Sequence, residues 1–297
     1  PDINGTVRCI TIIGNDIYIG GYFSSIGGQE RNNIAKLNNT TGAADANWNP
    51  NANSIVNVIA INGNDIYAGG LFTSIGGQTR NYIAKLNNTT GAADADWNPN
   101  GNNTVLSIAI SGSDIYIGGN FTSIGGQARN YISKLNNTSG AADAGWNPNA
   151  NLFVDVIAIN GNDIYAGGNF SSIGGQPRNN IAKLNNTTGA ADASWNPNPN
   201  SGIQSIAING NDIYAGGNFS SIGGQPRNNI AKLNNTTGAA DASWNPNPNS
   251  GIQSIAINGN DIYIGGYFSS IGGQTRNYIA KLNNTSGAAD AGWNPNA

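Results

Sequence analysis

The sequence repeats itself every 49 residues, six times in succession. A fixed period of about 20–50 residues is typical of repeat proteins, in which each repeat is too small to bury its own apolar surface and packs on its neighbours. The sequence therefore predicts one domain, residues 1–297, built of six similar repeats. The interval is visible in the six tryptophans, Trp48, Trp97, Trp146, Trp195, Trp244 and Trp293. The predicted repeats are residues 4–52, 53–101, 102–150, 151–199, 200–248 and 249–297.

The second repeat illustrates the expected strands. Residues 56–61 are rich in β-branched side chains, as in a strand. They are followed by Asn62-Gly63-Asn64-Asp65, a strong hairpin signal between two apolar runs. The stretch from Ser74 to Gln78 is expected to be a connecting loop, and Pro99 to stop the last strand. The four predicted strands are residues 56–61, 66–70 and 82–87 and a short segment around Trp97.

This pattern predicts an all-β fold. No segment has helical periodicity over a useful length, and four strands per repeat with short turns are typical of a β-propeller. We expect a six-bladed β-propeller with four-stranded antiparallel blades of 49 residues and pseudo-sixfold symmetry. A β-solenoid is the competing interpretation, but it would need atypical polar repeats at its ends, and the end repeats here look like the middle ones. This favours a closed ring in which no blade shares strands from both termini.

Three segments of each repeat resemble a known propeller repeat. In the second repeat they run from Gly69 to Ser74, from Arg80 to Asn87 and from Trp97 to Pro99. They are similar to the delta-60 type of β-propeller repeat, which is kelch-like in its double glycine and later tryptophan, although that repeat commonly has phenylalanine at the tryptophan position. The resemblance implies a large secreted or surface bacterial protein, and hence an extracellular or cell-surface location. It implies no catalytic residues.

Composition argues against catalysis and bound cofactors. The chain has no histidine, so the commonest general base and metal ligand is missing. We expect no enzyme activity, no cofactor and no metal site, and Cys9, the only cysteine, to be a small core residue. Two alternatives stay open: paired carboxylates could serve a glycoside-acting enzyme, and Asp65 with Asn62 and Asn64 could bind Ca²⁺. Against the enzyme, these acids recur in every repeat, unlike a single active site; against Ca²⁺, the turn has one carboxylate and lacks a full loop motif.

Charge is scarce and regularly placed. The second repeat carries Asp65, Arg80, Lys85 and Asp94, which sum to zero and predict ion pairs or backbone hydrogen bonds inside the repeat. The same four charges recur in every repeat. No basic surface is available for nucleic acid, and no apolar run is long enough for a membrane helix. The charges outside the repeated set, which account for the net charge of −3, are Asp2, Arg8, Glu30, Asp96 and Asp155.

Differences between the repeats are more informative than their sameness, because residues 157–214 and 206–263 are identical and indicate recent duplication. The differences gather after the double glycine, between the second and third strands, at the start of the third strand, and in the connection to the next repeat. In an up-and-down blade these regions emerge at one end, which predicts a binding surface there. Tolerated drift is the alternative. The candidate residues are Tyr22, Glu30, Leu71, Tyr82, Asp96, Asn120, Tyr131, Phe153, Asp155, Asn169, Asn218, Tyr267 and Tyr278.

The sequence therefore predicts a non-enzymatic repeat scaffold or interaction module. It would bind a protein or a glycan, if it binds anything, through the variable loops. The alternative is a purely structural or engineered, recently amplified propeller without a ligand. We expect a monomer, although near-identical repeats also invite domain swapping.

Overall fold

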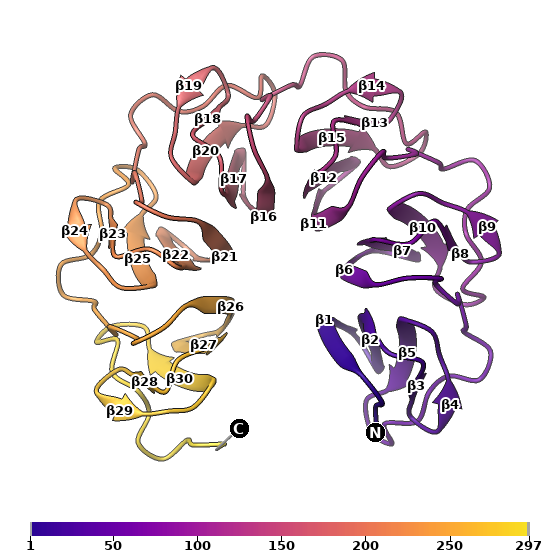
Figure 1. The fold of residues 1–297 in the computed structure, drawn as a ribbon, viewed down its shortest axis with the longest axis horizontal. Coiled ribbons are helices and arrows are strands. Elements are labelled where there is room, and N and C mark those ends of the chain that lie inside the picture. Colours follow the sequence, from indigo (N-terminus) through magenta and orange to yellow (C-terminus); the bar gives the residue numbers. More distant parts are fainter. Residues whose placement is uncertain (1, 296–297) are drawn as a thin grey trace. The chain divides into compact units, whose positions relative to one another are not determined.

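The computed structural model describes residues 2–295; Pro1, Asn296 and Ala297, at the ends of the predicted domain, lie outside the described residues. The described part is all-β, with thirty short strands joined by turns (Figure 1). It contains no helix that is long and apolar enough to cross a membrane. The chain divides after Asn147 into two compact halves, the N-terminal half and the C-terminal half, each with three blades.

Each repeat forms one blade, a three-stranded antiparallel sheet with the second strand in the middle. All strands of a blade come from one repeat. The first strands are β1 (Thr6–Ile13), β6 (Val56–Asn62), β11 (Val105–Ser111), β16 (Val154–Asn160), β21 (Ile203–Asn209) and β26 (Ile252–Asn258). The second strands are β2 (Asp16–Tyr22), β7 (Asp65–Gly70), β12 (Asp114–Gly119), β17 (Asp163–Gly168), β22 (Asp212–Gly217) and β27 (Asp261–Gly266). The third strands are β5 (Ile34–Asn38), β10 (Ile83–Asn87), β15 (Ile132–Asn136), β20 (Ile181–Asn185), β25 (Ile230–Asn234) and β30 (Ile279–Asn283).

The connection between the second and third strands, predicted as a plain loop, contains a small hairpin. Its two central glycines in the second blade, Gly76 and Gly77, have φ of 61° and 78°, and positive φ at both central residues is the mark of a type I′ turn. Within each half these hairpins lie on the outer side of the blades and the first strands on the inner side (Figure 1). The hairpins pair β3 (Ser25–Ile26) with β4 (Gln29–Glu30), β8 (Ser74–Ile75) with β9 (Gln78–Thr79), β13 (Ser123–Ile124) with β14 (Gln127–Ala128), β18 (Ser172–Ile173) with β19 (Gln176–Pro177), β23 (Ser221–Ile222) with β24 (Gln225–Pro226), and β28 (Ser270–Ile271) with β29 (Gln274–Thr275).

The predicted fourth strand is reduced to one bridge. Ala93 pairs with Leu86 of the third strand, and its amide donates to the carbonyl of Gly76 in the small hairpin at 2.9 Å. The next residue, Asp94, ends the pairing because its Oδ1 accepts the amides of Asp96 at 3.0 Å and Trp97 at 3.3 Å, which turns the chain. The expectation of a strand around the tryptophan was therefore wrong.

The turns at the other end of the sheet follow from their sequence. Gly63 has φ of 59° in the two-residue hairpin between Asn62 and Asp65, and glycine with positive φ at the first central position is what a type II′ turn requires. After the third strand, Asn87 Oδ1 accepts the amides of Thr89 and Thr90, both at 2.9 Å. This asparagine-closed turn explains why the same polar residues recur in each repeat.

Consecutive blades within a half pack through apolar faces. In the N-terminal half, Tyr18, Ile34 and Trp48 of the first blade lie in one cluster with Val56 and Ile59 of the second. All five are almost fully buried, and burial of a side chain of this size stabilises by about 1.5–3 kcal/mol. The surface that one repeat cannot bury by itself thus becomes core when the next repeat covers it.

Within each half, a tryptophan ties its blade to the next, as hydrogen bonds show for Trp48, Trp97, Trp195 and Trp244. Trp97 is fully buried and packs edge-on against Tyr67, with ring centroids 5.3 Å apart. Its Nε1 donates to the carbonyl of Asn136 in the next blade at 3.1 Å. In the C-terminal half the corresponding bond joins Trp195 to Asn234 at 3.0 Å. Five of the six tryptophans are fully buried, Trp293 is half-buried, and the buried indole rings thus link neighbouring blades within each half.

Candidate functional site

Side-chain hydrogen bonds define two ends of each blade. At the turn end, Asn88 Nδ2 after the third strand donates to Asn64 Oδ1 of the first hairpin at 3.2 Å. At the opposite end, which we call the loop end, Asn53 Oδ1 accepts the amides of Thr73 and Ser74 at 2.9 and 3.1 Å. This contact places the connection from the preceding blade beside the connection between the second and third strands, as expected of an up-and-down blade.

The double glycine brings the second strand close to the incoming connection at the loop end. A Cβ on Gly70 would lie 2.1 Å from the carbonyl oxygen of Ile55, so a larger residue would force the backbones apart. The amide of Leu71 donates to this same carbonyl at 2.8 Å. The backbone therefore fixes the residue after the double glycine beside the incoming connection, whatever side chain that residue carries.

The residue before the third strand has a left-handed backbone. Its φ is 63° at Asn33 and 64° at Tyr82, so the third strand of the second blade begins at Ile83 and not at Tyr82 as predicted. Asparagine tolerates this conformation, whereas a bulky side chain is strained in it. Tyr131 and Tyr278 share the strained geometry, with φ of 62° and 65°. Strain of this kind clusters at functional sites.

A bulge lies at the loop end of each first strand. In β6, Val56 pairs with Gly70 and Val58 with Gly69, which leaves Asn57 without a partner residue in the ladder. A bulge turns its side chain away from the regular alternation and is over-represented beside functional sites. The residue in this place takes five identities in six repeats: Arg8, Asn57, Leu106, Asp155, Gln204 and Gln253.

Most of the predicted site residues lie at the loop end, with unequal exposure. Tyr22 and Tyr267 are the most open, with 65% and 68% of their surfaces exposed. Tyr278 is also well exposed, and Leu71 and Phe153 are partly so. Of the others, Asn169 and Asn218 are exposed, and Tyr82, Asn120, Tyr131 and Asp155 are half-buried.

Two predicted residues lie apart from the double glycine, along the edge that carries the small hairpin. Glu30 pairs with Ser25 in that hairpin, and Asp96 belongs to the turn closed by Asp94. Arg31, next to Glu30 in the chain, donates to the Glu30 carbonyl at 2.6 Å. The exposed carboxylates of Glu30 and Asp96 therefore belong to the hairpin edge and to the turn before the tryptophan.

Three variable positions meet in the fourth repeat. The amide of Asn169 donates to the carbonyl of Phe153 at 3.0 Å, and Asn169 Nδ2 donates to Asp155 Oδ2 at 3.1 Å. Burial raises the pKa of Asp155 from 3.8 to about 6. The bulge thus sets a carboxylate, a carboxamide and an aromatic residue together at one loop end.

Comparison with known proteins identifies the repeat. A family model described as a domain of unknown function (DUF5122) beta-propeller matches all six repeats, over residues 15–47, 64–96, 114–145, 162–194, 211–243 and 260–292. Together these segments cover more than half of the chain. The chain belongs to the DUF5122 β-propeller family. The matched segments run from the first hairpin to the residue before the tryptophan, so the bulged residues lie outside them.

Solved structures agree with this fold. The computationally designed Ika8 protein is 12% identical with a TM-score of 0.62, over 96% of this chain and 86% of that chain. The WD40 β-propeller domain of Doa1 is 12% identical with a TM-score of 0.56, over 84% and 71% of the two chains. No curated protein matches the sequence. The prediction of an all-β, six-bladed propeller is confirmed; at this identity the likeness shows the fold alone.

The repeated charges of this DUF5122 chain form the predicted ion pairs. Lys232 Nζ lies 3.4 Å from Asp212 and 3.0 Å from Asp241, and it donates to the Asn284 carbonyl of the next blade at 3.4 Å. Hydrogen bonds from Ser243 and from Lys232 lower the pKa of Asp241 to about 2. A carboxyl held ionised in this way is unsuited to be a general acid.

The repeated arginines bind the backbone instead of the acids. Arg80 is almost fully buried. Its guanidinium donates to the carbonyls of Thr79 at 2.8 Å and Asp94 at 2.6 Å. Both cations of the DUF5122 repeat therefore hold the blade together.

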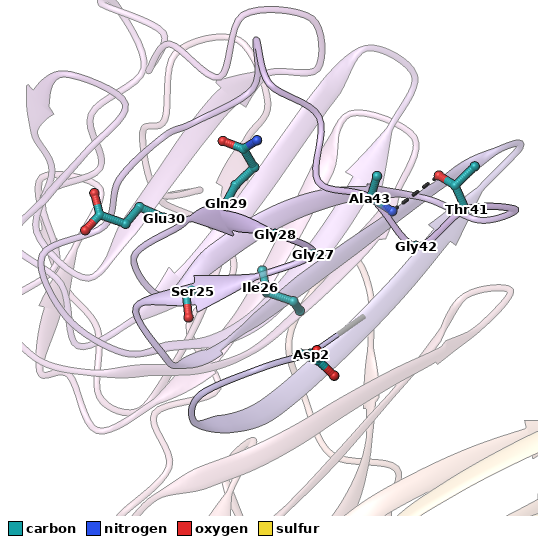
Figure 2. A pocket seen from close by; sticks show the side chains of 10 residues that line it. All are labelled: Asp2, Ser25, Ile26, Gly27, Gly28, Gln29, Glu30, Thr41, Gly42 and Ala43. Atoms are coloured by element: carbon teal, nitrogen blue, oxygen red, sulfur yellow. Dashed lines mark hydrogen bonds between the residues drawn. The ribbon is translucent and has the colours of Figure 1, made fainter.

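Two kinds of surface hollow lie beside predicted site residues. One of about 580 Å³ lies beside the small hairpin of the first blade (Figure 2), with Glu30 at one side and, at the other, Thr41, whose Oγ1 accepts the Ala43 amide at 3.3 Å. Similar hollows beside β8–β9 and β23–β24 mark it as a product of the DUF5122 repeat. A second kind, of about 350 Å³, lies at the loop end of the first blade and is lined by Tyr22 and Asn33.

No group of three or more histidine, cysteine, aspartate or glutamate residues within residues 2–295 could hold a metal ion. Cys9 packs against a core cluster, as predicted. Burial raises the pKa of its thiol to about 12, so the thiol stays protonated at neutral pH and is a poor nucleophile.

The sequence did not lead us to predict the four uncharged residues at the bulge as site residues. They are Asn57, Leu106, Gln204 and Gln253. A signal for them was present, because this position takes five identities, more than any other position of the first strands of the DUF5122 repeats. The pattern of strand alternation hid it, since a bulge reads as an ordinary strand residue until the ladder is known.

Proposed function

We propose that this DUF5122 propeller is a non-enzymatic interaction module that binds a protein or glycan partner through the loop ends of its blades. The observation that carries the proposal is the placement of sequence variation. Near-identical repeats differ after the double glycine, before the third strand and at the bulge, and these positions lie at the loop end. Loops held on a rigid scaffold commonly carry recognition.

The exposed side chains at the loop end support a binding role. Tyr22 and Tyr267 expose about two thirds of their surfaces, and tyrosine combines a large apolar ring with a polar tip. Tyr22 also lines the hollow of about 350 Å³ at the loop end of the first blade. Tyrosine is among the residues enriched where proteins meet partners.

The ion pairs formed by the repeated aspartates support the non-enzymatic part of the proposal. In the fifth repeat both acids lie within 3.4 Å of Lys232. Glycoside hydrolysis needs a protonated acid opposite an ionised one, and the low pKa of Asp241 does not provide it. We also propose a delta-60, kelch-like repeat and an extracellular or cell-surface location, which rest on the sequence resemblance.

The alternative is a structural array without a ligand. It is favoured by the backbone hydrogen bonds of the loop end, such as that from Leu71 to Ile55. Such bonds let a side chain vary at no cost to the fold, so drift alone would also produce variation there.

A paired-variant binding experiment separates the two. The purified chain is applied to a glycan array and to a bacterial surface-protein array. Changing Tyr22→Ser and Tyr267→Ser together should abolish most binding, because the exposed rings are lost. The matched control changes Thr40→Ala and Thr285→Ala, which lie at the turn ends of the same two blades, and should bind like the parent chain. Equal binding by both variants would contradict a role for the two tyrosines, and no binding on either array would favour the structural alternative.

A further inference from the structure

Resting on the proposed binding function, we propose that the fourth repeat carries a subsite for a neutral sugar, formed by Phe153, Asp155 and Asn169. In this subsite Asp155 and Asn169 bind sugar hydroxyl groups, and Phe153 packs on the apolar face of the sugar ring. Ligand sites of this kind combine an aromatic surface with a few convergent polar groups. The three residues belong to the C-terminal half and meet through the two hydrogen bonds of Asn169 described above.

Asp155 is suited to accept hydroxyl groups. The bulge of β16 between Val154 and Val156 removes it from the ladder. One of its oxygens receives Asn169 Nδ2, and an ionised carboxylate has about four acceptor positions. Burial raises its pKa, and the lysines of the C-terminal half pair with other aspartates. Acceptor capacity therefore remains for the hydroxyl donors of a ligand.

The surroundings favour a neutral ligand. Within the C-terminal half, β16 packs against β17 and β21. Strand β17 carries Asp163, which lies at the turn end and 3.9 Å from Lys183; β21 has no charged residue. An anionic sugar would meet the Asp155 carboxylate without a cation to attract it. A neutral sugar has hydroxyl donors and no such repulsion.

Asn169 is held in the orientation that the subsite needs. A Cβ on Gly202, in the connection to the next blade, would lie 2.4 Å from Asn169 Oδ1. Glycine there lets the amide oxygen lie against the neighbouring backbone while Nδ2 faces Asp155. Phe153, next to this pair, keeps 38% of its surface exposed. Part of the residue is therefore accessible to a ligand.

The fifth repeat provides an internal comparison. It has Gly202, Gln204 and Asn218 in the places of Phe153, Asp155 and Asn169. The backbone is the same, because the amide of Asn218 donates to the carbonyl of Gly202 at 3.2 Å. The carboxylate and the aromatic ring are absent. Asp155→Gln therefore places in the fourth repeat a residue that this backbone already accommodates.

The test measures sugar binding to the full 297-residue chain. An array of neutral, sialylated and sulfated oligosaccharides is screened at pH 7, and the dissociation constant of the best neutral oligosaccharide is measured by calorimetry. We expect neutral sugars to be preferred. Asp155→Gln and Asn169→Ala should each weaken binding about tenfold or more, since hydrogen bonds to charged groups are the stronger kind. Thr187→Ala, at the turn end of the same blade, where the hydroxyl donates to Asn186 Oδ1, is the matched control and should leave the dissociation constant unchanged.

The pH dependence adds a second readout. Asp155 is ionised above pH 6 and mostly protonated at pH 5, because its pKa is near 6. Binding to the parent chain should therefore weaken several-fold from pH 7 to pH 5, while the weaker binding of Asp155→Gln should be flat over this range. Circular dichroism at both pH values checks that each variant stays folded.

Other outcomes separate this subsite from the wider proposal. If sugar binding survives Asp155→Gln but is lost with the Tyr22 and Tyr267 variant, the subsite is wrong and the binding function stands. If the chain prefers anionic sugars, or binds only a protein that Asp155→Gln releases, the neutral-sugar assignment is wrong. If neither array gives binding, both proposals are overturned.

Discussion

The turn end of each blade and the variable position after its double glycine are held by different kinds of hydrogen bond. At the turn end, side chains close the structure, as when Asn87 Oδ1 accepts two turn amides and Asn88 reaches Asn64. At the loop end, Asn53 also holds the neighbouring loop with its side chain, but the variable residue after the double glycine is held by its backbone, as between the Leu71 amide and the Ile55 carbonyl. A side-chain bond requires one residue type, whereas a backbone bond does not. This difference explains why the duplicated repeats have similar sequences at the turn end and different ones at the variable positions of the loop end.

The fourth repeat sharpens this comparison. Its loop end has the same backbone bonds as the fifth repeat, yet it displays Phe153 and Asp155 where the fifth displays Gly202 and Gln204. Backbone closure thus lets the scaffold present different chemistry at equivalent places. Such freedom is a condition for recognition and does not by itself establish a ligand.

The largest effect on stability is expected at the tryptophan that joins two blades, which belongs to neither the turn end nor the loop end. Trp195→Ala should lower the free energy of unfolding by about 3–5 kcal/mol, the usual range for a buried tryptophan, because it is fully buried and bonds Asn234 of the next blade. Chemical denaturation measures the change. Trp195→Phe is the control, which keeps an aromatic ring and loses the hydrogen bond, and should cost clearly less. A loss below about 1 kcal/mol for Trp195→Ala would contradict the link between blades.

One variant at each end of the same blade compares the two ends directly, and the effect on stability should be intermediate. Asn87→Ala removes the acceptor of two turn amides, and we expect a loss of about 1–2 kcal/mol in the free energy of unfolding. Leu71→Ala, at the loop end of the same blade, should change stability by no more than about 0.5 kcal/mol, because its backbone bond to Ile55 is kept. Parallel urea titrations compare them. Equal losses would break the distinction between side-chain and backbone closure.

The smallest effect, and one of opposite sign, is expected at Tyr278. Its φ of 65° is strained for a bulky residue, and it is well exposed. Tyr278→Asn places the residue type found at Asn33, Asn180 and Asn229, and should raise the free energy of unfolding by about 0.5–1 kcal/mol. Thermal unfolding should detect the gain. Tyr278→Val, a β-branched control, should lower stability instead; a gain from valine would show that backbone strain is not the cause.

Much of the blade could be predicted from local sequence. Asn62 to Asp65 has the composition of a hairpin, and Asp65, Arg80, Lys85 and Asp94 balance in charge, so a hairpin and internal ion pairs were expected; the structure confirms a hairpin there and an ion pair between Lys85 and Asp94. The hairpin depends on residues that are neighbours in the chain, and the ion pairs were inferred because the charges of a repeat sum to zero. The small hairpin at Gly76 and Gly77 was missed, although its paired glycines were a usable signal.

The candidate site was harder to predict. The positions of Leu71, Phe153 and Asn169 were found from differences between repeats, but the carboxylate–carboxamide pair of Asp155 and Asn169 was not. These two residues are fourteen positions apart, and their contact depends on the bulge and on the twist of two strands. No local preference in the sequence encodes such a bulge.

The sequence by itself determined the number of blades, because a fixed period with one hydrophobic pattern gives one packing unit per repeat. It also determined the turns, since glycine and asparagine permit backbone conformations that other residues disfavour. The tertiary structure alone decided that the tryptophan bonds the next blade, that the fourth strand ends at Ala93, and that Asp155 meets Asn169. Those outcomes depend on which backbone groups remain unpaired after neighbouring elements pack, and that is settled by contacts between segments distant in the chain.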